Sequence, residues 1–125
     1  MSGLLVDTHA LLWSIGEVGR LSDAARESLE SMATEAYVSP ASVWEIAIKR
    51  QAGKLEAPES LFDEIRRAQF RELPISFEHA AIAGALPLHH RDPFDRMIVA
   101  QAQSERLTVV TSDPHFAVYG VAVLW

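Results

Sequence analysis

Short apolar runs alternate with amphipathic stretches along the whole chain. The runs are apolar at consecutive positions, which is typical of strands that are buried on both faces. The expected strands are Leu4–Val6, Ala36–Ser39, Leu73–Ser76, Leu107–Thr111 and Val121–Trp125. Strands of this kind, separated by helices, predict an α/β fold in which a central, mainly parallel sheet lies between two helix layers, a three-layer α/β/α domain.

The stretches between the runs carry helix start signals. Ser22, Ser39 and Ser76 are expected N-caps, and Asp92 is another. A proline follows both Ser39 and Asp92, at the first helical position. The expected helices cover residues 23–33, 40–51, 59–69, 77–86 and 93–105. Ala25, Leu29 and Met32 should share the buried face of the first, and Trp13 and Trp44 are expected in the core.

Composition narrows the class of protein. The 125 residues fit one domain covering 1–125, with 49% hydrophobic residues and no cysteine. No basic leader or apolar run of about 20 residues stands out, so we expect a soluble, cytoplasmic protein with no membrane partner. The net charge of −6 argues mildly against a constitutive nucleic-acid binder. Basic residues between Lys49 and Arg71 run against this trend, although two solvated helix faces would look the same.

Four acids occupy positions where parallel α/β sheets bind ligands. Asp7 and Asp113 each follow a predicted strand, beyond its carboxyl end. Glu45 stands between Trp44 and Ile46, and Asp95 lies in the first turn of its helix. Each acid also has an ordinary explanation. Asp7 could cap a helix, Glu45 could pair with Lys49, Asp95 could favour the helix dipole, and Asp113 could open a turn.

Taken together, the four acids indicate a metal site. Asp92 already serves as the cap of the helix that contains Asp95, and the surroundings of Glu45 are too apolar for a solvated face. Carboxylates that converge on one spot repel one another unless a cation is bound. Ligands that are all oxygen select Mg²⁺ or Mn²⁺.

The order of these motifs along the chain resembles that of a known family. The segments "LLVDTHALLW", "SVWEIAIKRQAGKL", "LPIS", "HHRDPFDRMIVAQA" and "LTVVTSDPHF", in this order and followed by "VAVLW", are similar to PIN-domain ribonucleases of the VapC toxin type. The resemblance spans essentially the whole chain. It implies catalytic and metal-binding roles for Asp7, Glu45, Asp95 and Asp113. It also implies that Thr111 or Ser112 orients a carboxylate or a water.

The same resemblance implies an activity and partners. It points to a Mg²⁺-dependent endoribonuclease that hydrolyses RNA phosphodiesters, with Mn²⁺ as an alternative ion. It further implies a VapB-like antitoxin as partner and a homodimer. Two alternatives remain open: a non-catalytic PIN-like RNA-binding or interaction module, and an RNA-processing nuclease that is not a toxin. A phosphoacceptor receiver domain and an aspartyl-nucleophile phosphatase are excluded, because Asp7 lacks the paired acid that either would need.

Other polar residues near these motifs are ambiguous. His89 and His90 are expected to be structural or exposed rather than metal ligands, since adjacent side chains diverge and imidazole is softer than this site requires. Arg96 could contact phosphate or pair with an acid. His9 and His115 are left unassigned, and Asp92 is interpreted as a cap rather than a ligand.

Overall fold

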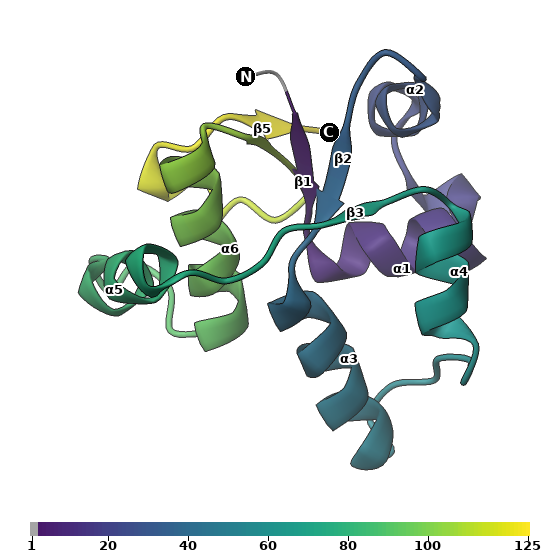
Figure 1. Cartoon of the computed structure of the whole chain (residues 1–125), viewed down its shortest axis with the longest axis horizontal. Coiled ribbons are helices and arrows are strands. Elements are labelled where there is room, and N and C mark those ends of the chain that lie inside the picture. The colour runs from purple at the N-terminus through teal and green to yellow at the C-terminus, as the bar shows by residue number, and fades with distance from the viewer. Residues whose placement is uncertain (1–2) are drawn as a thin grey trace.

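The computed structural model describes residues 3–125, and all five of its strands lie in a single parallel sheet. The strands are β1 (Leu4–Val6), β2 (Ala36–Val38), β3 (Arg71–Glu72), β4 (Thr108–Val110) and β5 (Val123–Leu124). Their order across the sheet is β3-β2-β1-β4-β5 (Figure 1). The chain therefore leaves the central β1 in one direction and later returns to its other side. In such a sheet, ligands bind where the connections diverge, at the carboxyl ends of β1 and β4.

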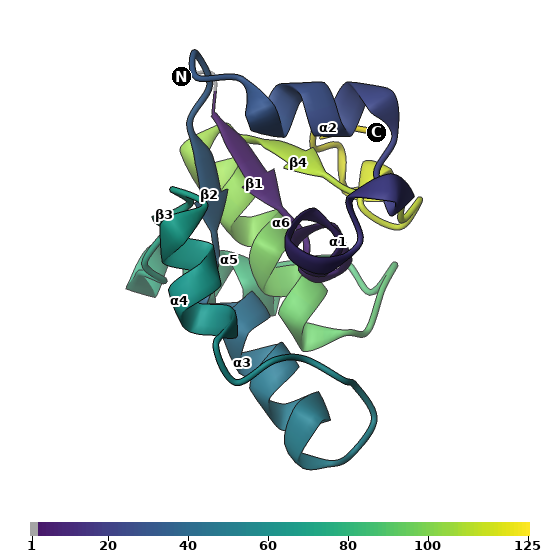
Figure 2. The ribbon, with the colours of Figure 1, turned by 90° about the vertical axis from the view of Figure 1, so that its right-hand side faces the viewer.

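Helices connect and cover the strands. They are α1 (Thr8–Gly16), α2 (Asp23–Glu30), α3 (Pro40–Gln51), α4 (Leu61–Arg67), α5 (Phe77–Ala85) and α6 (Pro93–Glu105), with short 3-10 turns η1 (Val18–Arg20) and η2 (Ala117–Tyr119). Figures 1 and 2 show α5 and α6 on one face of the sheet, α1 and α2 on the other, and α3 extending beyond its lower end. The predicted three-layer α/β/α architecture is confirmed.

Two apolar clusters fill the spaces between the layers, and β1 contributes to both. Leu4 and Val6 pack with residues of α1, α2 and α4, whereas Leu5 packs with residues of α6 and with Phe116. Successive side chains of a strand point to opposite faces, so a run of three apolar residues supplies both cores. This two-sided burial holds β1 rigid, and it fixes the position of the residue that follows.

Four of the five strands were predicted at the right place, and the third was not. It was expected at Leu73–Ser76, but β3 covers Arg71 and Glu72. The Leu73 amide still donates to the Val38 carbonyl at 3.0 Å, and pairing stops at Pro74, which has no N–H to donate. The helix expected over 59–69 is the shorter α4.

Two apolar residues expected in the core are exposed. Met32 is 92% exposed, because α2 ends at Glu30 and Ser31 is extended, which turns the chain away from the sheet. Trp44 is 64% exposed and stands edge-on to the Phe94 ring, with the ring centroids 5.3 Å apart. Within residues 3–125, none of the helices has the length and apolarity to cross a membrane.

Candidate active site

The carboxyl ends of β1 and β4 hold two acids joined through one hydroxyl. Asp7 follows β1, and the adjacent β4 is followed by Thr111 and Asp113, with Val6 paired to Val110. The Thr111 hydroxyl donates to Asp7 Oδ2, and its Oγ1 accepts the Asp113 backbone N–H at 3.0 Å. Of the two hydroxyl residues considered from the sequence, Thr111 makes this link, whereas Ser112 is exposed.

Asp7 both caps a helix and faces the site. Its Oδ1 accepts the Ala10 backbone N–H at 2.7 Å at the start of α1, and its side chain is buried. Burial raises the pKa of Asp7, and the nearby Asp113 adds to the rise, while the hydrogen bonds from Thr111 and Ala10 oppose it. The cap interpretation and the site interpretation therefore describe the same carboxylate.

Glu45 is linked to the segment that contains Asp7 by a hydrogen bond from Thr8, the residue after Asp7. It is 3% exposed on the first turns of α3, where Thr8 donates its hydroxyl to Oε1 at 2.7 Å. Lys49 Nζ lies 2.6 Å from Oε2, so the predicted pair between residues four apart is present. Glu45 is therefore both a buried acid and the partner of Lys49. Its negative charge is better compensated than the charges of the other acids.

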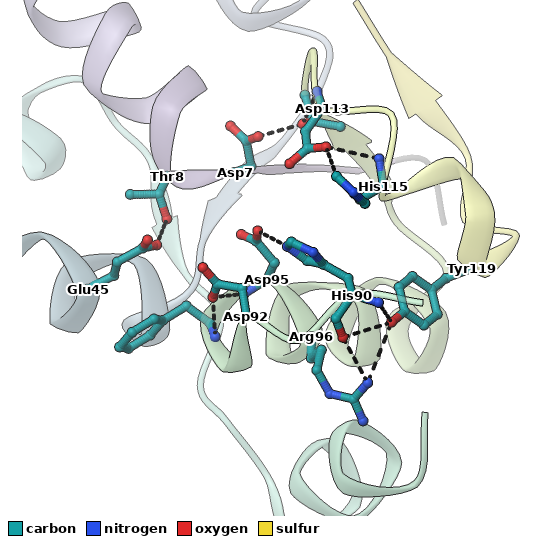
Figure 3. A network of polar contacts seen from close by, with 12 residues as sticks. Asp7, Thr8, Glu45, His90, Asp92, Asp95, Arg96, Asp113, His115 and Tyr119 are labelled. Atoms are coloured by element: carbon teal, nitrogen blue, oxygen red, sulfur yellow. Dashed lines mark hydrogen bonds and ion pairs between the residues drawn. The ribbon is translucent and has the colours of Figure 1, made fainter. Parts of the chain in front are cut away.

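Asp95 projects from the first turn of α6 on the opposite side of the gap from Asp7 and Asp113 (Figure 3). Asp92 caps this helix as predicted, since its Oδ1 accepts the N–H groups of Phe94 and Asp95 at 2.8 and 3.1 Å. Burial raises the pKa of Asp95 to about 6, and the charges of Asp92 and Glu45 add to this, although the hydrogen bond with His90 opposes it. Asp95 is consequently an acid whose negative charge is poorly compensated.

Two histidines that sequence reasoning did not assign to the site lie inside it. His90 Nε2 is 2.8 Å from Asp95 Oδ2, and His115 Nδ1 is 2.8 Å from Asp113 Oδ1. Burial of Asp113 would raise its pKa, but the backbone and ring hydrogen bonds from His115 outweigh burial and hold the pKa below its usual value. The only local signal was the short spacing of each histidine from an acid, as in "DPH". His90 is half-buried at the site rather than exposed, and the expectation that it is structural rather than a metal ligand stays a prediction.

Arg96 points away from the acids. Its buried guanidinium donates to the carbonyls of Ala83, Leu86, Pro87 and His90, at 2.9 to 3.3 Å. The sequence-based roles, contact with phosphate or pairing with an acid, are therefore replaced by a structural one. Arg96 braces the loop between α5 and α6, which positions His90.

The remaining candidates lie at the edge of the site. His89 is exposed, with its ring edge-on to Tyr119 at 5.3 Å, in agreement with a structural or surface role. His9 is exposed beside the Trp13 ring, at 5.8 Å between centroids, and it lies close enough for its charge to lower the pKa of Asp7.

The donor set fits a hard divalent cation. Within residues 3–125, no lysine or arginine forms an ion pair with Asp7, Asp95 or Asp113. Two of these carboxyls, Asp7 and Asp95, have raised pKa values because they are buried. A cation bound by carboxylate oxygens would compensate these charges, and such ligands suit Mg²⁺ or Mn²⁺.

Comparison with solved structures identifies similar folds in toxin–antitoxin complexes. One is VapBC2 from Rickettsia felis bound to a fragment of promoter DNA, with a TM-score of 0.73, 16% identity and coverage of 98% of this chain and 97% of that chain. DNA-bound VapBC from Salmonella typhimurium also has a TM-score of 0.73, with 21% identity and coverage of 98% and 97%. VapBC-5 from Mycobacterium tuberculosis has a TM-score of 0.58, 18% identity and coverage of 98% and 94%.

Family membership follows from the sequence match. Comparison with curated proteins gave no significant match. The PIN-domain family model matches residues 4–122, which include all four acids and nearly the whole sheet. The chain belongs to the PIN-domain family.

Proposed function

We propose that the chain is a Mg²⁺-dependent endoribonuclease and the toxin of a VapBC-type pair. The observation that supports this most directly is the arrangement of Asp7, Asp95 and Asp113. These acids come from three segments and face one gap, and within residues 3–125 none of them pairs with a lysine or arginine. Membership of the PIN-domain family and the resemblance to VapC toxins supply the reaction class.

Each residue has a proposed role in this reaction. Asp7, Asp95 and Asp113 would hold the ion, which, when bound, polarises the phosphate and lowers the pKa of the attacking water. Thr111 fixes the Asp7 carboxylate, and Thr8 and Lys49 hold Glu45 nearby. Glu45 would then bind the ion through water or position the nucleophile. The products expected from the resemblance have 5′-phosphate and 3′-hydroxyl ends.

An antitoxin would explain how such an activity is kept silent. An apolar groove of about 430 Å³ lies between α3 and α4, lined in part by Val43, Trp44, Phe62 and Phe70. Trp44 and Phe62 are 64% and 48% exposed, and Trp44 contacts Phe94, the neighbour of Asp95. A helix or extended segment in this groove could therefore extend an Arg or Lys to the acids, in competition with the metal. The similar VapBC structures support a VapB-like protein as this partner.

A homodimer is part of the same proposal. Small PIN toxins resembling this chain generally pair, and the chain is 49% hydrophobic. Two-fold pairing would place two acidic sites in a fixed relation, so that one RNA or a pair of antitoxins could span both. Light scattering of the purified chain, with and without the protein encoded next to its gene, tests this. A strict monomer at high micromolar concentration, unchanged by that protein, would remove both claims.

RNA cleavage by metal-free protein tests the activity. We expect no cleavage in excess EDTA, recovery with Mg²⁺ or Mn²⁺, and no recovery for Asp95→Asn. Cleavage that persists in EDTA would contradict the mechanism. Tight Mn²⁺ binding without any cleavage would favour a non-catalytic module, and an isolated gene with no small DNA-binding partner beside it would favour an RNA-processing nuclease.

A further inference from the structure

Two imidazole rings separate the acids of α6 from those that follow β4. His90 precedes α6 and His115 follows β4, and their rings stack with centroids 4.5 Å apart and planes inclined by 19° (Figure 3). The proposed reaction uses neither ring. Their nitrogens contact acids of the site rather than backbone groups, so the packing of the fold alone does not explain them.

The two rings and one acid form a compact set of ligand atoms. One ligand atom from each of His90, Asp113 and His115 lies within 4.8 Å of the others. His115 Nδ1 and Asp113 Oδ1 are 2.8 Å apart. Two ligands about 2.0–2.1 Å from one ion lie about 3 Å from each other, so this pair is already spaced to chelate one cation.

The chemistry of the set differs from that of the carboxylates. Imidazole nitrogen suits Zn²⁺ and other first-row transition ions, whereas Mg²⁺ requires oxygen ligands. Asp95 Oδ2 beside His90 Nε2 is the type of carboxylate partner that orients a ligating imidazole. Three protein ligands would also leave a coordination position for water.

We propose that His90, Asp113 and His115 form a cation site that binds Zn²⁺ or a similar transition ion in preference to Mg²⁺. The site shares Asp113 with the carboxylates, so an ion bound there and an ion held by Asp7 and Asp95 influence each other. The inference is independent of the ribonuclease proposal, because binding of the metal alone tests it.

The experiment is calorimetric titration of untagged, metal-free protein with ZnCl₂ and, separately, with MgCl₂. His90→Gln and His115→Asn are the informative variants, because an amide preserves hydrogen bonding to the acid but is a poor ligand for Zn²⁺. We expect each variant to bind Zn²⁺ roughly 10–100-fold more weakly and to keep its Mg²⁺ affinity. His89→Ala is the matched control, since the His89 ring packs edge-on against Tyr119 and forms no ion pair with an acid among residues 3–125. It should bind Zn²⁺ like the parent.

Cobalt gives a second readout. Co²⁺ bound by two nitrogens and a carboxylate should give a visible absorption spectrum that both amide variants lose, while circular dichroism confirms that they are folded. Unchanged Zn²⁺ affinity in both variants would overturn the proposal. So would an equal loss of Zn²⁺ and Mg²⁺ affinity, because the histidines would then only position the acids.

Discussion

Thr111 donates its hydroxyl to Asp7, a residue 104 positions earlier in the chain, and the same oxygen accepts the backbone N–H of Asp113. One buried hydroxyl therefore sets the orientation of the carboxylate that follows β1 and the course of the chain after β4. Thr111 is 3% exposed, so this hydrogen bond lies in the interior of the protein.

Replacement of Thr111 by valine tests this link. Thr111→Val keeps the shape but removes the donor to Asp7, and an unsatisfied buried group costs about 1–3 kcal/mol. We expect a loss of Mg²⁺ affinity or cleavage of roughly 10–100-fold, as is typical when a partner of a metal ligand is removed. Thr111→Ser should recover most of it. Calorimetry with Mg²⁺ and a cleavage assay provide the measurement, and a fully active valine variant would contradict the assigned role.

The raised pKa of Asp95 predicts how metal-free protein responds to pH. Because the folded chain binds this proton more tightly than the unfolded chain, the contribution of Asp95 to stability falls as pH rises from the ordinary pKa of an aspartate, 3.8, through its raised pKa of about 6. Asp95→Asn mimics the protonated acid. In EDTA, it should therefore be more stable than the parent at about pH 7.5 and similar at about pH 4.5.

Addition of Mg²⁺ should reverse that order. Bound metal compensates the ionised carboxylate, so the parent should gain stability at about pH 7.5 and Asp95→Asn should gain much less. Thermal melting at the two pH values, with EDTA or with Mg²⁺, measures all four conditions. Equal stabilisation of both proteins by Mg²⁺ would exclude Asp95 as a ligand.

Arg96 should be a determinant of stability rather than of substrate binding. Arg96→Met keeps the aliphatic length but removes the guanidinium donor to the Ala83 and Leu86 carbonyls, at a cost of about 1–3 kcal/mol or more. The Pro87 and His90 carbonyls also lose Arg96 but still accept from the Tyr119 hydroxyl. Urea unfolding measures this. Arg91→Met is a suitable control, because Arg91 is exposed on the same loop. A loss of RNA affinity in Arg96→Met with unchanged stability would instead restore a phosphate contact.

The groove between α3 and α4 predicts where an antitoxin binds. Phe62→Asp places a charge among the apolar lining residues Val43 and Phe70, so complex formation with the partner should weaken at least tenfold. Affinity for Mg²⁺ should be unchanged, since Phe62 lines the groove between α3 and α4 rather than the gap between the acids. Co-purification and calorimetry measure the effect, and the exposed Phe77 on α5, changed to Asp, is the control. A normal complex with the Phe62 variant would place the partner elsewhere.

The parts of the fold that sequence reasoning found are those with a local signal. Strands buried on both faces are continuous apolar runs, and serine or aspartate caps mark the starts of α2, α3, α5 and α6. The edge strand β3 has no such signal, because Arg71 and Glu72 are both exposed and pair on one side with β2. Met32 was misplaced because helical periodicity does not reveal where a helix ends.

The site residues that could be predicted are likewise those with a local sequence signal. The sequence predicted that Asp7, Glu45, Asp95 and Asp113 come together, and they lie around one region of the structure (Figure 3). Their metal-binding and catalytic roles stay predictions. The two histidines could not be assigned, because their positions depend on how loops from different parts of the chain pack. The Arg96 brace depends on four carbonyls whose directions no local pattern specifies.

The position of Arg96 next to Asp95 has a mechanical consequence. Through Arg96, helix α6 holds the loop that contains His90, so Asp95 and its histidine keep a fixed relation to the helix. A second set of linked residues lies at the carboxyl ends of β1 and β4, namely Asp7, Thr111, Asp113 and His115. The two sets meet at the stacked rings of His90 and His115, so a change of either ring would alter the position of both Asp95 and Asp113.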